Sequence, residues 1–188
     1  MSVSVVVLAA GKGTRMKSDL PKVLHKVLGK SLLAHSLDAL SFVNNQYVVV
    51  GHESDKVVNS LPPTTKHILQ KDQLGTGHAV STVINSDLFI ENKSELTLVV
   101  PGDVPAIDFK DIELLISEVK TKSSSVGFLT SIIKNPYGYG RVIRNNEEIR
   151  IVEEKDCNDD ERKINEINSG IYCFNTDFLI KNIDSLDT

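Results

Sequence analysis

An apolar run at the start of the chain constrains its fold more than any other feature. Residues 3–10 read VSVVVLAA, which is rich in β-branched residues and apolar on both faces. Such a segment is typical of a strand at the centre of a sheet that is covered by helices on both sides. It is too short to cross a bilayer and lacks the basic leader of a signal peptide, so we expect no contact with a membrane.

Segments with helical and strand patterns alternate after this first strand. Leucines at helical spacing behind a capping serine predict a helix over residues 31–43, and a strand is expected over residues 46–50. The same alternation gives strands at 66–69 and 95–100 and helices at 75–84 and 109–120. This order predicts an α/β, Rossmann-like fold with a mostly parallel central sheet and helices on both faces.

Three loops that contain glycine follow predicted strands, at residues 11–13, 75–77 and 102–103. Sheets of this class bind ligands beyond the carboxyl ends of their strands, so these loops are candidates for a binding site.

The pattern changes after residue 125. Strand-like runs at 126–133, 141–144, 149–154 and 167–174 follow one another without long helices between them. They predict a small antiparallel extension of the sheet, with residues 147–166 forming an acidic, solvated loop and one short helix. A length of 188 residues suits one core, so we expect a single domain over residues 1–188.

Charge is distributed unevenly along the chain. The formal net charge is −4, which argues against nucleic acid as a partner, because duplex-binding surfaces are normally basic. Residues 12–30 nevertheless carry six basic residues against the single acid Asp19, enough to meet a polyphosphate, although a solvated basic surface is the ordinary alternative. Cys157 and Cys173 form neither a disulfide framework nor a metal cluster and are compatible with a reducing cytoplasm.

The loop after the first strand has the residues of a phosphate site. Gly11 and Gly13 permit a sharp turn in which phosphate oxygens approach backbone N–H groups, and Arg15 and Lys22 can clamp different oxygens of one polyphosphate. The loop is not a dinucleotide-binding fingerprint, since Met16 replaces the third glycine, and it is not a P-loop. Two glycines at this spacing are, by themselves, more often an ordinary tight turn.

Six ordered blocks together resemble a known family, and the first of them consists of LAAGKGTRM followed by LPKVLH. LAAGKGTRM and LPKVLH are similar to the signature of sugar-phosphate nucleotidylyltransferases in the MobA-like NTP transferase superfamily. The resemblance is strongest to N-acetylglucosamine-1-phosphate uridyltransferases, which form the N-terminal domain of a bifunctional bacterial uridyltransferase/glucosamine-1-phosphate acetyltransferase. The further matching blocks are QLGTGHA at 73–79, GDVP at 102–105, GYGR at 138–141, IVEEKD at 151–156 and EINSGIY at 166–172.

The resemblance implies an enzyme that joins UTP and N-acetyl-α-D-glucosamine 1-phosphate into UDP-N-acetylglucosamine and pyrophosphate, for peptidoglycan and lipopolysaccharide precursors. It implies catalytic roles for Arg15 and Lys22, and Mg²⁺ held by Asp103. Gln70 and Gln73 would face the base, and a glycine, a carboxylate and an amide would hold the sugar. The implied nucleotide- and sugar-binding residues are Leu8, Ala9, Ala10, Gly11, Lys22, Gln70, Gln73, Gly75, Thr76, Pro101, Gly102, Asp103, Gly140, Glu153 and Asn168.

Two departures from the family pattern stand out. Pro101 occupies the position where the family usually has a tyrosine, and the family's second metal ligand, an asparagine, would lie beyond Thr188. The β-helix through which full-length relatives oligomerise, and which carries their acetyltransferase activity, has no counterpart here, so we expect no acetyl-CoA chemistry. Two alternatives stay open: a nucleotidylyltransferase for another sugar phosphate or a molybdopterin-type substrate, and a nucleotide-sugar-binding module with impaired catalysis.

Overall fold

The computed structural model describes residues 2–13, 16–145 and 148–185. The chain forms two compact units, the first made of Met1–Gly127 with Cys173–Thr188 and the second of Phe128–Tyr172. The expectation of a single domain stays a prediction.

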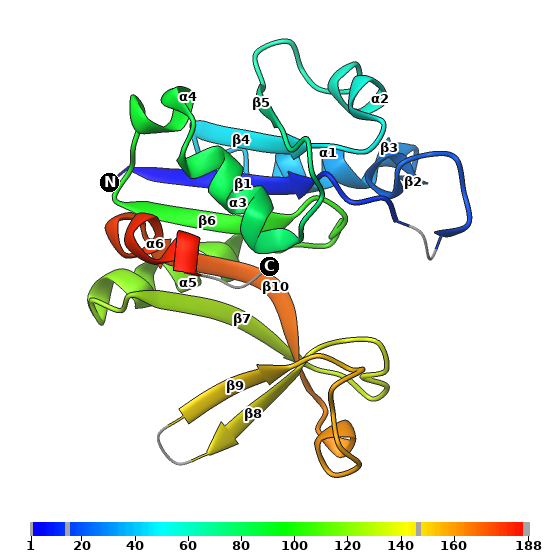
Figure 1. Ribbon diagram of the computed structural model, residues 1–188, viewed down its shortest axis with the longest axis vertical. Coiled ribbons are helices and arrows are strands. Elements are labelled where there is room, and N and C mark those ends of the chain that lie inside the picture. Colours follow the sequence, from blue (N-terminus) through cyan, green and yellow to red (C-terminus); the bar gives the residue numbers. More distant parts are fainter. Residues whose placement is uncertain (1, 14–15, 146–147, 186–188) are drawn as a thin grey trace. The chain divides into compact units, whose positions relative to one another are not determined.

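The first unit is built on a parallel sheet (Figure 1). Its strands lie in the order β5 (Lys66–Leu69), β4 (Asn45–Val50), β1 (Val3–Ala9) and β6 (Leu96–Pro101), with β10 (Glu166–Asn175) next to β6. Strand β1 pairs in parallel with both β4 and β6, and its Val5, Val6 and Val7 are completely buried. The prediction of a central first strand that is buried on both faces is therefore confirmed.

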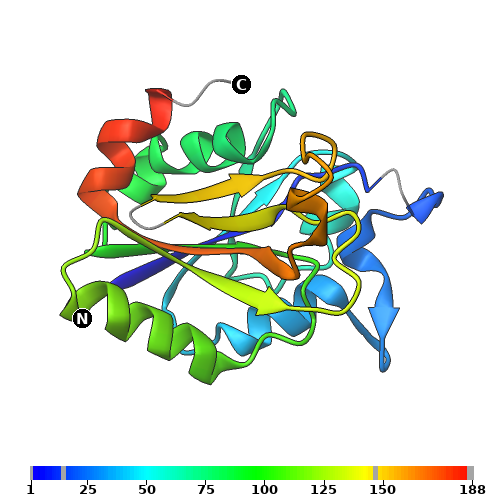
Figure 2. The same cartoon turned by 90° about the horizontal axis from the view of Figure 1, so that it is seen from below.

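Helices cover both faces of this sheet, as predicted. Figures 1 and 2 show α1 (Leu32–Ala39) and α5 (Phe109–Thr121) on one face and α3 (Thr76–Ile84) and α6 (Thr176–Asn182) on the other. Capping side chains begin two of these helices: Ser31 accepts a hydrogen bond from the Ala34 N–H, and Asp108 accepts one from the Lys110 N–H. The apolar face of α5 buries Ile112, Leu115, Ile116 and Val119.

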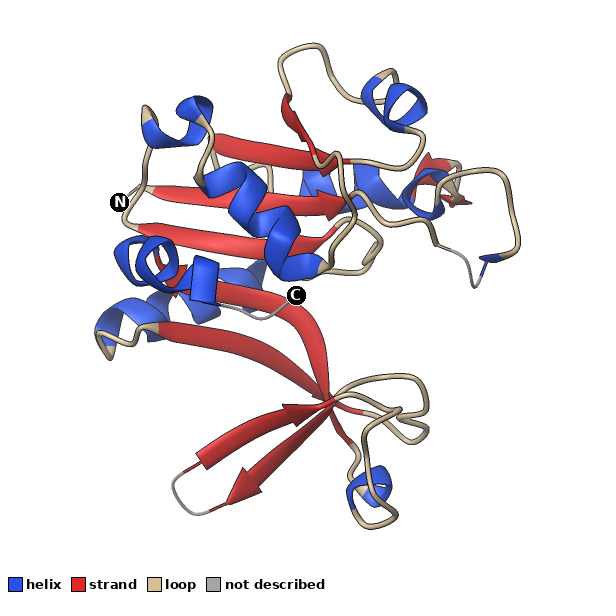
Figure 3. Ribbon diagram, in the orientation of Figure 1, coloured by secondary structure: helices blue, strands red, loops and turns tan. Residues whose placement is uncertain are grey.

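Several short elements were not predicted from the sequence (Figure 3). They are the hairpin β2 (Lys26–Val27) and β3 (Lys30–Ser31), the helices α2 (Ser54–Val58), α4 (Asp87–Ile90) and α6, and the 3-10 turns η2 (Lys22–Leu24) and η4 (Ile183–Ser185). Within the described residues, no helix combines the length and apolar character that crossing a membrane requires.

The second unit contains the antiparallel strands. Strand β8 (Arg141–Asn145) pairs antiparallel with β9 (Glu148–Val152) and, through Arg141 and Ile167, with β10, while β7 (Val126–Ile132) also pairs with β10. The loop after β9 contains the 3-10 turn η3 (Glu161–Lys163), close to the expected acidic loop with one short helix. The predicted antiparallel extension is confirmed.

Both cysteines are buried and free, so no disulfide joins them. Burial raises the pKa of the Cys173 thiol to about 12. A thiol with so high a pKa is not a nucleophile near neutral pH, because the thiolate is the reactive form. Cys173 is also completely buried, so its thiol is not exposed to a ligand.

Candidate functional site

The loops after β1, β4, β5 and β6 lie at one edge of the first unit, because these strands run in parallel and their carboxyl ends coincide. Backbone segments approach one another closely there. The Gly102 N–H donates to the Leu8 carbonyl at 2.9 Å, and the His52 N–H donates to the Ala10 carbonyl at 3.2 Å. A Cβ at Gly102 or at Gly51 would lie 2.9 Å from the same two carbonyl oxygens, so the contacts require glycine.

Gly51 was missed in the sequence analysis. It comes directly after the apolar strand at 46–50, and Gly102 comes one residue beyond the strand at 95–100. A glycine at the end of an apolar strand was the sequence signal that could have identified Gly51.

The glycine loop after β1 packs directly against Lys22. Gly13 has a φ of +59°, and a Cβ on it would lie 2.7 Å from the Lys22 Cβ. Lys22 begins the 3-10 turn η2, immediately after the buried Pro21. The turn at Gly13 therefore brings the glycine loop and the lysine into contact, although the two are separated along the chain.

Lys22 and Asp103 meet in an ion pair at this edge. Lys22 Nζ lies 2.5 Å from Asp103 Oδ2, and the two side chains are 43% and 25% exposed. Because both remain partly exposed, a ligand can reach either charge. Arg15, the other predicted catalytic cation, lies outside the described residues.

The predicted base-binding residues lie between β5 and α3. Gln70 follows β5 and is only 3% exposed, and its N–H donates to the Val50 carbonyl at 2.8 Å. Its side-chain Nε2 contacts the Gly75 carbonyl at 3.2 Å and His78 Nδ1 at 2.9 Å. Gln73 and Thr76 are exposed in the same segment, and Pro101 ends β6, opposite Leu8.

The second unit brings together the three predicted sugar-binding residues. The Asn168 N–H donates to the Gly140 carbonyl at 2.9 Å, and a Cβ on Gly140 would lie 3.2 Å from Glu153 Oε1. The amide of Asn168 is fixed, since Nδ2 donates to the Tyr172 hydroxyl at 2.7 Å and Oδ1 accepts from the Gly170 N–H at 3.0 Å. Burial raises the pKa of Tyr172, so this hydroxyl stays neutral.

A buried arginine holds the loop that precedes Gly140. Arg141 is 2% exposed, and its guanidinium donates to the Tyr139 carbonyl and, at 2.7 Å, to Glu154 Oε2. Glu154 also accepts from the Gly138 N–H at 3.0 Å. The Arg141 hydrogen bond, followed by the Gly138 hydrogen bond, lowers the pKa of Glu154, which keeps the carboxylate charged. Sequence reasoning gave neither Arg141 nor Glu154 a role.

The described residues contain no group of three or more His, Cys, Asp or Glu side chains placed to hold a metal ion. Asp103 alone still suits Mg²⁺, because it is a hard oxygen donor that a ligand can reach, and Mg²⁺ normally keeps waters and takes substrate phosphates as further ligands. The residues present therefore fit a partial site that a bound polyphosphate would complete.

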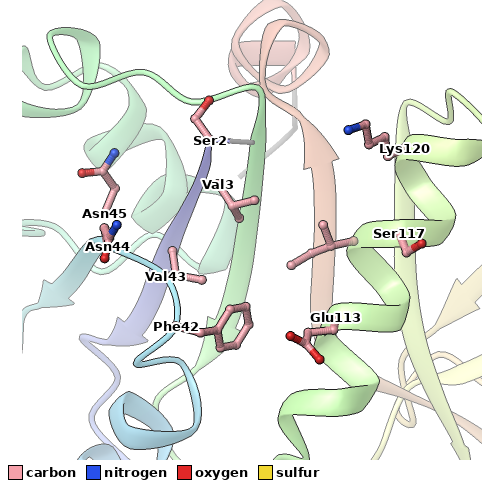
Figure 4. A pocket seen from close by; sticks show the side chains of 10 residues that line it. Ser2, Val3, Phe42, Val43, Asn44, Asn45, Glu113, Ser117 and Lys120 are labelled. Carbon is pink, nitrogen blue, oxygen red and sulfur yellow. The ribbon is translucent and has the colours of Figure 1, made fainter.

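A cavity of about 630 Å³ lies at the other end of the sheet (Figure 4). Its lining includes Ser2 and Val3 at the start of β1, Phe42 and Asn45 before or at the start of β4, and Glu113 on α5. At about 3.3 Å per residue, the length of β1 separates it from the carboxyl edge by roughly 20 Å. None of the predicted site residues lines it.

A parallel α/β sheet with glycine-containing loops at its carboxyl edge defines the Rossmann-like class of proteins, which bind their ligands at that edge. Comparison with protein families identifies the group more closely. The MobA-like NTP transferase domain matches residues 5–144, and the chain belongs to this family. The resemblance seen in the sequence motifs is thereby confirmed.

Curated relatives cover the chain almost completely. It is 47% identical over 192 residues to the bifunctional protein GlmU of Lactococcus lactis subsp. lactis (strain IL1403). This match covers 100% of this chain and 41% of the relative. GlmU of Fervidobacterium nodosum is 45% identical over 184 residues, with 98% and 40% covered. The chain thus spans about two fifths of the length of these relatives.

Solved structures share the fold. A putative glucose-1-phosphate thymidylyltransferase from Bacillus anthracis superposes with a TM-score of 0.79 at 18% identity, covering 100% of this chain and 76% of the other. A CMP:2-keto-3-deoxy-manno-octonic acid synthetase complexed with CTP gives a TM-score of 0.69 at 19% identity, with 100% and 79% covered. The Rossmann-like architecture predicted from the sequence is confirmed.

Proposed function

We propose that this chain transfers the uridylyl group of UTP to N-acetyl-α-D-glucosamine 1-phosphate, giving UDP-N-acetylglucosamine and pyrophosphate. The observation that carries the proposal is the contact of Lys22 with both Gly13 and Asp103 at the carboxyl edge of the first unit. The 47% identity to a GlmU protein over the whole chain supports this substrate pair.

In the proposed reaction, an oxygen of the sugar phosphate forms a bond to the α-phosphorus of UTP. The bond from that phosphorus to the bridging oxygen breaks, and pyrophosphate leaves with the electron pair. The nucleophile is already an anion near neutral pH, so alignment and charge stabilisation suffice and no general base is required.

Each part of the site has a role in this proposal. Backbone N–H groups of the loop from Gly11 to Gly13 donate to phosphate oxygens, and Lys22 and Arg15 neutralise the charge that redistributes during transfer. Lys22 must exchange the Asp103 carboxylate for a phosphate oxygen when the nucleotide binds. Asp103 is then free to hold Mg²⁺, which would neutralise further phosphate charge.

Glu153, Asn168 and the backbone at Gly140 are proposed to bind the sugar phosphate. A carboxylate accepts hydrogen bonds from sugar hydroxyls, and an amide both donates and accepts them. Glycine at position 140 leaves room for close approach of the ligand to the backbone.

The test measures pyrophosphate release from this chain with Mg²⁺, using a panel of nucleoside triphosphates and sugar 1-phosphates. UTP with N-acetylglucosamine 1-phosphate is expected to give the highest kcat/KM. No release from any pair, or faster release from another pair, would reject the proposed reaction.

Substitutions at Asp103 and Arg15 test whether these residues belong to the site. Asp103→Ala and Arg15→Ala should each reduce turnover at least about a hundredfold, the scale for losing one electrostatic stabiliser, with the melting temperature little changed. Asp111→Ala, an exposed aspartate in the first turn of α5, is the matched control and should keep normal turnover. Near-normal turnover in Asp103→Ala would remove Asp103 from the site.

A further inference from the structure

The hydrogen bonds of the Gln70 side chain leave one of its two polar atoms available. An amide nitrogen carries two hydrogens, and those of Gln70 Nε2 point to the Gly75 carbonyl at 3.2 Å and to His78 Nδ1 at 2.9 Å. Among the described residues, His25 Nε2 and Arg141 Nε are the buried polar side-chain atoms without a partner. Gln70 Oε1 is not one of these buried atoms. It is therefore accessible, and it is the acceptor of this side chain that a ligand can use.

The Gly75 carbonyl and His78 together determine which end of the amide is available. Its Nδ1 accepts the hydrogen bond only when the ring hydrogen is on Nε2, and the Gly75 carbonyl is always an acceptor. A reversed Gln70 amide would point its oxygen at the Gly75 carbonyl, which has no hydrogen to donate, and it would meet a hydrogen on His78 only in the other ring tautomer. The two acceptors together therefore favour a single orientation of Gln70.

We propose that His78 is a positioning residue that fixes the Gln70 amide with its oxygen toward the base and so makes the site select uracil over cytosine. This inference rests on the proposed function, in which Gln70 faces the base. The N3 atom of uracil carries a hydrogen that a fixed carbonyl oxygen accepts. The N3 atom of cytosine carries a lone pair instead, which opposes that oxygen.

The experiment is calorimetric titration of UTP and of CTP, each with Mg²⁺, into the wild-type chain and three variants. His78→Leu removes the acceptor, His78→Asn offers Oδ1 in its place, and His67→Leu removes an exposed histidine on β5 as the matched control. Binding is measured instead of turnover so that the readout does not depend on catalysis.

Wild type and His67→Leu are expected to prefer UTP to the same extent. His78→Leu should reduce the preference for UTP over CTP about tenfold, because the Gln70 amide loses one hydrogen-bond partner. His78→Asn should restore most of this preference. An unchanged ratio in a folded His78→Leu would overturn the role of His78 alone. A wild-type chain that binds no UTP would overturn the proposed function together with this inference.

A second measurement observes the His78 ring directly in the wild-type chain. Long-range ¹H–¹⁵N spectra of the histidine rings report which nitrogen carries the hydrogen, and the His78 signal is assigned by its loss in His78→Asn. The hydrogen on Nε2, with an unprotonated Nδ1, is the expected form. A hydrogen on Nδ1 in the neutral ring would contradict the proposal, because that atom then accepts nothing from Gln70.

Discussion

Gly13 and Lys22 illustrate how single residues build the proposed phosphate site. The φ of +59° at Gly13 is a conformation that residues with a Cβ adopt at a cost of roughly 1–2 kcal/mol. In addition, a Cβ there would lie 2.7 Å from the Lys22 Cβ. An alanine at position 13 therefore has to move either the glycine loop or Lys22.

Gly13→Ala is expected to weaken UTP binding at least about tenfold, because displaced N–H groups and a displaced ammonium lose their charge-assisted hydrogen bonds to phosphate. The measurement is calorimetric titration with UTP and Mg²⁺. Gly29→Ala is the matched control, since Gly29 also has a positive φ, +83°, but a Cβ on it would meet nothing within 4 Å. Equal UTP affinities of the two variants would remove the Gly13 turn from the site.

Sequence alone predicted the types of residue at this site better than their contacts. The glycines and Lys22 were recognised by the turn and by the local excess of basic charge. The ion pair of Lys22 with Asp103 joins the loops after β1 and β6. Such contacts depend on how the parallel strands align, which no local pattern encodes. His78 contacts Gln70 from α3 within the same segment, and no pattern in the sequence predicted that contact.

Among the secondary-structure elements, those with long periodic patterns were the predictable ones. The helix expected over 109–120 is α5, and the strand expected over 66–69 is β5 with the same bounds. The hairpin of β2 and β3 was missed because each strand has two residues and the turn contains Leu28, a non-glycine residue at φ +52°. Very short elements form through tertiary contacts, and their sequences carry little periodicity.

The cap of α5 gives a prediction at this scale. Asp108→Ala should lower the free energy of unfolding by about 1 kcal/mol, since the Lys110 N–H loses its side-chain acceptor at 2.9 Å. Urea denaturation measures the change. Glu113→Ala, an exposed position within the same helix, should change stability by less than about 0.5 kcal/mol. A loss for Asp108→Ala no greater than that of this control would show that the cap does not stabilise the helix.

The molecule as a whole divides the predicted binding residues between its two units. Every described residue assigned to the nucleotide belongs to the first unit, and Gly140, Glu153 and Asn168, which are assigned to the sugar, belong to the second. The change from alternating elements to antiparallel strands was predicted from the sequence, and the single domain over residues 1–188 stays a prediction.

A crystal structure of this chain with UTP and Mg²⁺ tests the central claim most directly. We predict that the triphosphate lies at the N–H groups of the loop from Gly11 to Gly13, with Lys22 Nζ moved from Asp103 to a phosphate oxygen and uracil N3 facing Gln70 Oε1. UTP bound in the cavity at the amino ends of the strands, or elsewhere, with Lys22 still paired to Asp103, would contradict it.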